Sequence, residues 1–329
     1  MLHPTPALKK QKEKWIVSRE YDLFFFIGST VFSLIFFFVY KIFTENKDPL
    51  IAHENEFYLV LMFYTLFDHP HIFQTFSRSH FDHSTKSRRK YFSLAFLFFL
   101  ALVFFFYKLK LWGYLMNIMS LWGLWHIYKQ NYGILAAYHS CSLTPKLLKY
   151  FEQKMLGLTY SSVVVYYILL NHFKIRLPQY TEILLLIFLG LIFSCWICKI
   201  SKQTLKNQIP RILFISSICS FTVWSFLVCT DVSILVHVAI ETIYHNIQYQ
   251  GWVMHYQNQS KSKEYCFLWL LSSMLYGCIY ATLVYASINA PIVQTLTKVY
   301  LAAVLYHYYI DGQVWKLSSY PEIKKIFCI

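Results

Sequence analysis

The residues best suited to chemistry are histidines and carboxylates that recur one helical turn apart inside apolar stretches. The stretch 231–257 carries His237, Glu241 and His245 at intervals of four, and Gln248 follows Glu241 by seven. Four residues make about one helical turn, so these side chains share one face of a helix. An ionised carboxylate in hydrocarbon is costly, so such a residue usually faces the interior of a bundle and has a partner there. Glu and His at this spacing are a potential pair of metal ligands.

Three other apolar stretches carry polar side chains at the same one-turn spacing. The pairs are Asp68 and His71, His126 and Gln130, and His307 and Asp311. Residues three or four apart lie on the same face of a helix. Pro70 is expected to kink its helix or to begin a new helical turn, which would help to turn His69 and His71 inward.

The members of these pairs predict a metal site. The predicted ligands are four histidines and two carboxylates: His71, His126, Glu241, His245, His307 and Asp311. Nitrogen and oxygen donors suit iron, manganese or zinc, whereas Cu(I) and iron–sulfur clusters take soft thiolates. Six donors could hold two ions, or one ion with carboxylates that orient the histidine rings. The residues expected to support the site or to contact a substrate are Asp68, His69, Arg78, Gln130, His237 and Gln248.

Each of these residues also has an ordinary structural interpretation. A lone histidine in a membrane more often bonds one helix to another than binds a metal. His237 is expected near the outer end of its helix, and so ranks below Glu241 and His245 as a ligand. His139 is expected to be solvated at the membrane rim. The metal hypothesis therefore depends on the set and not on any single residue.

The composition indicates which elements must position these residues. The chain has 329 residues, of which 57% are hydrophobic, 20% aromatic and only 14% charged. Soluble domains have about 25% charged residues, so these values predict an integral membrane protein. The net charge of +14 does not indicate a nucleic-acid partner, because Lys and Arg fall in short segments between apolar runs.

The apolar runs predict an all-α, multi-pass bundle of about ten membrane spans, with eight as the lower bound. The expected spans are 22–43, 57–77, 91–107, 111–139, 155–171, 181–199, 211–229, 231–257, 265–287 and 292–315. Lys and Arg concentrate in every second connection, which places both termini in the cytoplasm. The organisation expected is a tail over 1–20, one membrane domain over 21–316 and a tail over 317–329.

This topology brings the four histidines to a similar depth. His71, His126, His245 and His307 lie in the four even-numbered spans that carry most of the polar residues, and these spans all run in the same direction. At ~1.5 Å per residue, each imidazole would lie roughly 10–20 Å from the cytoplasmic surface. Because Lys and Arg alone define the topology, the agreement in depth is independent support for a shared site.

In its general arrangement this chain resembles the His-rich integral-membrane non-haem iron enzymes. The fatty-acid desaturases and hydroxylases and the carotene-cleaving membrane oxygenases also gather histidines from several helices near the cytoplasmic face. Their His-x-x-x-His and His-x-x-His-His boxes are absent here, where the patterns are His-x-x-x-Gln, Glu-x-x-x-His and His-x-x-x-Asp. The resemblance implies an iron-dependent oxidoreductase that acts on a lipid-like or apolar substrate at the cytoplasmic side, with an electron donor as a partner.

Other classes of protein remain open on the sequence alone. An ion- or proton-coupled transporter would also bury His, Glu and Asp near one side of the membrane. A haem protein could use His126 or His245 together with His307 as axial ligands. Zinc would instead activate water for hydrolysis, and a metal-free transferase could use one histidine as a base with Asp311 or Glu241.

Overall fold

The structure is a computed structural model of the chain. It describes residues 14–45, 48–178, 180–201, 208–227, 229, 232–260, 263–286, 291–316, 320, 323 and 326–327. Helices make up most of these residues, and no strand occurs among them. The all-α prediction is confirmed for this part of the chain. The two predicted tails, 1–20 and 317–329, fall mostly outside it.

Each predicted apolar span coincides with a helix or with a run of consecutive helices. The α-helices are α1 (Arg19–Asp22), α2 (Ser29–Thr44), α3 (Pro49–Phe63), α4 (His69–Phe76), α5 (Arg89–Lys108), α6 (Trp112–Cys141), α7 (Lys146–Tyr167), α8 (Tyr180–Ile200), α9 (Ile209–Leu227), α10 (Ile234–Ser260), α11 (Lys263–Ala286) and α12 (Pro291–Val314). The π-helical turns are η1 (Leu23–Ile27), η2 (Tyr64–Asp68), η3 (Ser77–Phe81) and η5 (Ile168–His172), and η4 (His83–Arg88) is a 3₁₀ helix.

The number of helices that could cross a membrane is lower than the ten predicted. In the described part of the chain, three helices are long and apolar enough by themselves: 83–108, 180–200 and 209–227. A fourth candidate combines 19–27 with 29–44, two segments bent by 46°. These helices indicate a membrane protein, but they do not establish a ten-span bundle. One physical reason is that α6, α10 and α12 contain many polar side chains, and the π-helical turn η2 interrupts the second predicted span.

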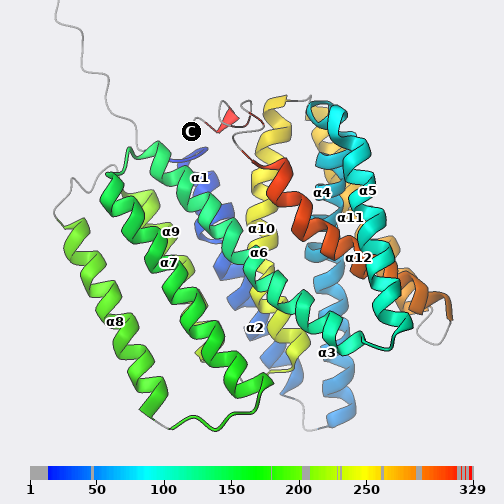
Figure 1. The fold of residues 1–329 in the computed structure, drawn as a ribbon, viewed down its shortest axis with the longest axis horizontal. Coiled ribbons are helices and arrows are strands. Elements are labelled where there is room, and N and C mark those ends of the chain that lie inside the picture. The colour runs from blue at the N-terminus through cyan, green and yellow to red at the C-terminus, as the bar shows by residue number, and fades with distance from the viewer. Residues whose placement is uncertain are drawn as a thin grey trace, which may run out of the picture.

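The helix α10 lies in the middle of the bundle and separates two groups of helices (Figure 1). On one side are α7, α8 and α9, with α8 at the edge; on the other are α4, α5, α11 and α12. The most extensive helix pairs are α2 with α10, α5 with α12, α7 with α9 and α4 with α11. Helix α6 crosses the face of the bundle and contacts α9, α7, α12 and α10. Residues of α4, α6, α10 and α12 can therefore meet in one place.

The segment before α4 determines where His71 lies. Pro70 occupies the first turn of α4, so a new helix begins beside it, as the sequence predicted. The preceding turn η2 is π-helical, which adjusts the backbone next to a proline that has no N–H to donate. Gly277 of α11 lies against this turn, where a Cβ atom would come 2.3 Å from the Thr65 carbonyl oxygen. Only glycine allows that approach, so Gly277 fixes the packing of α11 on the segment that carries His71.

A buried ionic network ties α6, α7, α8 and α9 together on the other side of the molecule. Glu152 Oε2 is 2.7 Å from His139 Nε2 and 3.2 Å from Arg211 Nη1, and Trp196 donates to Glu152 Oε1 at 2.9 Å. His139 is 3% exposed. The expectation that His139 is solvated is therefore wrong, because helix packing covers this end of α6.

Candidate metal centre

Four histidines from four different helices meet beside α10. They are His71 of α4, His126 of α6, His245 of α10 and His307 of α12, and none is more than 8% exposed. Each offers one ring nitrogen such that the four atoms all lie within 4.8 Å of one another. The sequence predicted these four residues as ligands, and the structure brings all four together in a group that could hold a metal ion.

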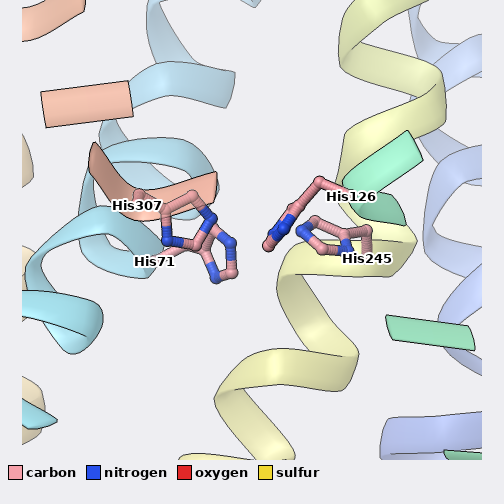
Figure 2. Close-up of side chains that lie close together, drawn as sticks. All are labelled: His71, His126, His245 and His307. Carbon is pink, nitrogen blue, oxygen red and sulfur yellow. The ribbon is translucent and has the colours of Figure 1, made fainter. Parts of the chain in front are cut away.

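The four rings form a closed quadrilateral. Ring centroids are 4.3 Å apart for His71 and His307, 4.9 Å for His71 and His245, 5.0 Å for His126 and His245, and 4.7 Å for His126 and His307. Interplanar angles of 71–78° place each ring edge-on to its neighbours. Figure 2 shows His71 and His307 on one side of a small space and His126 and His245 on the other.

Every histidine of the group has a buried ring nitrogen without a hydrogen-bond partner among the described residues. These atoms are Nδ1 and Nε2 of His71, Nε2 of His126, Nδ1 of His245 and Nε2 of His307. Leaving a buried polar atom unpaired costs about 1–3 kcal/mol. Native structures rarely accept several such atoms in one place, and an ion is a usual explanation. At a metal–nitrogen distance of about 2.0–2.1 Å, tetrahedral donors lie about 3.4 Å apart, so small side-chain movements would complete a site.

A hydrogen-bond network contacts His307 at the Nδ1 side of its ring. Thr75 Oγ1 lies 2.6 Å from His307 Nδ1 and donates to Asp311 Oδ1 at 2.8 Å. The hydroxyl of Tyr249 also donates to Asp311 Oδ1, at 2.8 Å. The indole N–H of Trp315 donates in turn to the Tyr249 hydroxyl at 3.1 Å.

With Asp311 ionised, this network assigns the tautomer of His307. An ionised Asp311 only accepts hydrogen bonds, so the single Thr75 proton is directed to that carboxylate. Thr75 must then accept from His307 Nδ1–H. A neutral His307 therefore carries its proton on Nδ1 and a lone pair on Nε2, a buried atom without a hydrogen-bond partner among the described residues. Metal-ligating histidines are commonly oriented in this way through the nitrogen that does not bind the ion.

Asp311 lies beside the four histidines, although it is not a member of the group. Its Oδ2 atom is 3.4 Å from His307 Nδ1 and 3.8 Å from His126 Nε2, and it has no hydrogen-bond partner among the described residues. The carboxylate thus supplies the negative charge nearest to four neutral imidazoles. Its place fits a residue that orients His307 and offers a free oxygen toward the site.

A cavity of about 400 Å³ adjoins the group, between α6, α10 and α12. His126 and Asp311 form part of its wall. Half of the remaining lining residues are aromatic: Trp122, Trp125, Tyr132, Tyr249, Trp252, Tyr308 and Trp315. Sites for small molecules are typically apolar cavities of about 300–1,000 Å³ with a few polar groups. The space therefore fits an apolar ligand next to the histidines.

The structure does not bring Glu241 into the group. Glu241 is 2% exposed, and neither carboxylate oxygen has a hydrogen-bond partner among the described residues. The polar groups near it are Ser225 of α9 and the phenols of Tyr160 and Tyr244. Glu241 therefore faces the α7–α9 side of α10, whereas His245, one turn later, faces α4 and α12.

Two glutamines bridge helices at the turn of α10 that carries His245. Gln130 Nε2 donates to the backbone carbonyl of His245 at 2.9 Å and to Gln248 Oε1 at 3.1 Å. Gln248 Nε2 donates to the Phe26 carbonyl at 3.0 Å. This chain of bonds fixes α6 and η1 against the turn of α10 that carries His245, so both glutamines act through the backbone.

Asp68 and His69 lie in a separate cluster of tyrosines. The hydroxyl of Tyr300 donates to Asp68 Oδ2. The His69 ring stacks on Tyr64, with centroids 5.5 Å apart, and contacts Tyr280 at 4.3 Å. His69 and His71 are thus both buried but point to different surroundings, because residues two apart occupy different faces of a helix.

Arg78 and His237 do not contact the histidine group. Arg78 Nη1 donates to Tyr256 at 2.8 Å, and its guanidinium lies 5.2 Å from the Trp315 ring. Arg78 is linked to the site through the Trp315–Tyr249–Asp311 contacts. His237 stacks on Tyr167 with centroids 4.6 Å apart and bonds the Cys229 carbonyl at 3.3 Å, two turns of α10 from His245.

Sequence reasoning missed Thr75 and Tyr249. Both follow a histidine of the group by four residues, Thr75 after His71 and Tyr249 after His245. All four histidines are therefore followed one turn later by a hydrogen-bonding side chain. The spacing rule that selected Gln130 and Asp311 would have found these two residues if hydroxyl groups had been included.

In comparisons with known proteins, no family model matches this chain, and neither a curated protein nor a solved structure does. The site therefore has to be interpreted from its own geometry. That geometry establishes four buried histidines that could hold a metal ion. They lie in a helical protein that has several helices long and apolar enough to cross a membrane.

Proposed function

We propose that this protein is an integral-membrane, metal-dependent enzyme whose metal ion is bound by His71, His126, His245 and His307. The observation that carries the proposal is that each of these buried rings has an unpartnered nitrogen and that the four donors converge within 4.8 Å. Four helices contribute one residue each, so a metal ion would stabilise the bundle at its centre. The run of helices from α3 to α4 and the helices α6, α10 and α12 are taken to cross the membrane together with the more apolar ones.

The donor set favours iron, with manganese and zinc as the other candidates. No cysteine belongs to the group among the described residues, which disfavours ions that prefer sulfur. Four neutral imidazoles and one nearby carboxylate leave room for a further ligand on the cavity side. Bound iron with an open position would supply oxidative chemistry on an apolar substrate, and an external electron donor would then be required.

The protein's own side chains have definable roles in such a reaction. Thr75 and Asp311 hold His307 so that Nε2 faces the ion. Tyr249 and Trp315 hold Asp311 in turn. The aromatic wall would position an apolar substrate beside His126. Asp311 Oδ2 is the nearest group able to accept or hold a proton at the site.

The geometry gives less support to a haem protein. Two axial histidines lie on opposite faces of a planar macrocycle. Here each ring is in edge-to-face contact with two others, with neighbouring centroids no more than 5.0 Å apart. A porphyrin between His71 and His307 on one side and His126 and His245 on the other would need these pairs to separate.

Metal analysis of protein purified in mild detergent tests the proposal, together with an optical spectrum. We expect one equivalent of iron, manganese or zinc, no Soret band, and loss of most of the metal in His245→Ala. His237→Ala is the matched control, because His237 is a buried histidine of the same helix outside the group. Wild-type protein without metal after expression with each ion supplied, or a His245→Ala protein with full occupancy, would contradict the assignment.

Glu241 favours proton-coupled transport as a second candidate function. It is a buried carboxyl group with no hydrogen-bond partner among the described residues, one turn from His245. Such groups in membrane helices often lie on ion pathways. Purified protein in vesicles distinguishes the two functions: a pH-driven flux that Glu241→Gln abolishes, with no bound metal, supports transport and contradicts the metalloenzyme.

A further inference from the structure

The cavity beside the histidines carries one positively charged group. Lys129 of α6 lines it, with its ammonium 5.0 Å from the Tyr132 ring centroid and 5.8 Å from that of Trp125. Both rings belong to the cavity wall. Among the described residues, no carboxylate forms an ion pair with Lys129. Asp311 supplies a carboxylate to the wall of the same cavity, but its ionic contacts are with His126 and His307.

Lys129 is also exposed on a face of α6 that is otherwise suited to lipid. Trp125, Lys129 and Gly133 form an exposed stripe at four-residue spacing. A cation within a membrane helix is costly unless it finds a partner or reaches water. Contact with two aromatic rings compensates part of that cost. An anionic group on a molecule in the cavity would compensate more of it, because the cation and the apolar wall belong to the same space.

We infer that the cavity binds a single-chain acidic amphiphile, a long-chain carboxylic acid, with the carboxylate at Lys129 and the apolar chain along the aromatic wall. This inference rests on the proposed function, whose substrate class it specifies. A volume of about 400 Å³ lies at the lower end of the range for ligand cavities, so it suits one chain better than a two-chain phospholipid.

The position of Lys129 also determines which part of the ligand is next to the metal ligands. Lys129 follows His126 by three residues, a rise of about 4.5 Å along α6. His126 and Lys129 are both in the cavity wall. The carbon atoms close to the acid group, rather than the far end of the chain, therefore lie beside the histidines.

Binding of a radiolabelled long-chain carboxylic acid to the purified protein in a neutral detergent tests the inference. The comparison ligands are the alcohol of equal chain length and phosphatidylglycerol. We expect the wild-type protein to prefer the acid to the alcohol, and Lys129→Gln to bind the acid about tenfold more weakly with unchanged binding of the alcohol. Lys199→Gln is the matched control, because Lys199 is an exposed lysine over an aromatic ring, Phe151, outside the cavity.

Two further measurements distinguish the loss of the Lys129 charge from a loss of folding or of metal. Lys129→Arg should retain the preference for the acid, which separates the role of the charge from a loss of folding. Metal content in the same samples should be equal in wild-type and Lys129→Gln protein. Equal affinity for acid and alcohol, an unchanged Lys129→Gln, or tighter binding of phosphatidylglycerol would overturn the inference even if the metal is present. Absence of metal with the expected ligand preference would instead refute only the proposed function.

Discussion

The hydrogen-bond network behind His307 can be tested by a change of one atom, Thr75→Val. Valine has nearly the shape of threonine but cannot accept from His307 Nδ1–H, 2.6 Å away, or donate to Asp311 Oδ1, 2.8 Å away. Loss of such a partner typically lowers metal affinity about 10–100-fold, or about 1.4–2.7 kcal/mol. Asp311 Oδ2 lies 3.4 Å from Nδ1 and can take over part of the role. We therefore expect the lower value, about tenfold.

The assay is competition with a chelator of known affinity, followed by metal analysis of the protein. Thr159→Val is the matched control, because Thr159 is equally buried in α7 and its hydroxyl has no hydrogen-bond partner among the described residues. Removal of an unpaired hydroxyl should not weaken the protein. Thr75→Ser keeps the hydroxyl and should restore most of the affinity.

A clear result would refute the reasoning about His307. If Thr75→Val binds the metal as tightly as wild-type protein while remaining folded, then the Nδ1–H bond to Thr75 does not orient the ligand. If Thr75→Val and Thr159→Val lose affinity equally, the effect is a general loss of stability. A normal affinity in Thr75→Val with a strongly reduced affinity in His307→Ala would mean that His307 binds the metal without help from the network.

Three more expected outcomes follow from the structure. Glu241→Gln should keep its full complement of metal, because the structure places this carboxylate outside the histidine group; metal analysis that shows a loss would restore it as a ligand. Glu152→Gln should lower the free energy of unfolding by about 3–5 kcal/mol, since it leaves the buried guanidinium of Arg211 without its charged partner; thermal unfolding in detergent measures this, and a change below about 1 kcal/mol would contradict it. Tags inserted near residues 86 and 174 should be accessible from opposite sides of the membrane, and accessibility of both from the cytoplasm would refute the proposed topology.

The helical segments and the four histidines of the group could be predicted from the amino-acid sequence alone. The apolar runs located each helical segment, because length and hydropathy are local properties of the chain. Lys and Arg in the connections predict one common depth for His71, His126, His245 and His307, and this depth stays a prediction. The structure brings these four together. One-turn spacing inside apolar runs was enough to select these residues, because it is a local property of the chain.

Tertiary structure decided which of the neighbouring polar residues belong to the site. Glu241 and Asp311 each lie four residues from a histidine, and the spacing cannot separate them. Asp311 lies beside the histidines because α12 packs near α4 and α6, whereas Glu241 faces α9 and α7 one turn away. The side chains that surround a helix face depend on which helices pack against it. Which helices pack against one another depends on contacts between residues far apart in the sequence, and no local sequence pattern indicates those contacts.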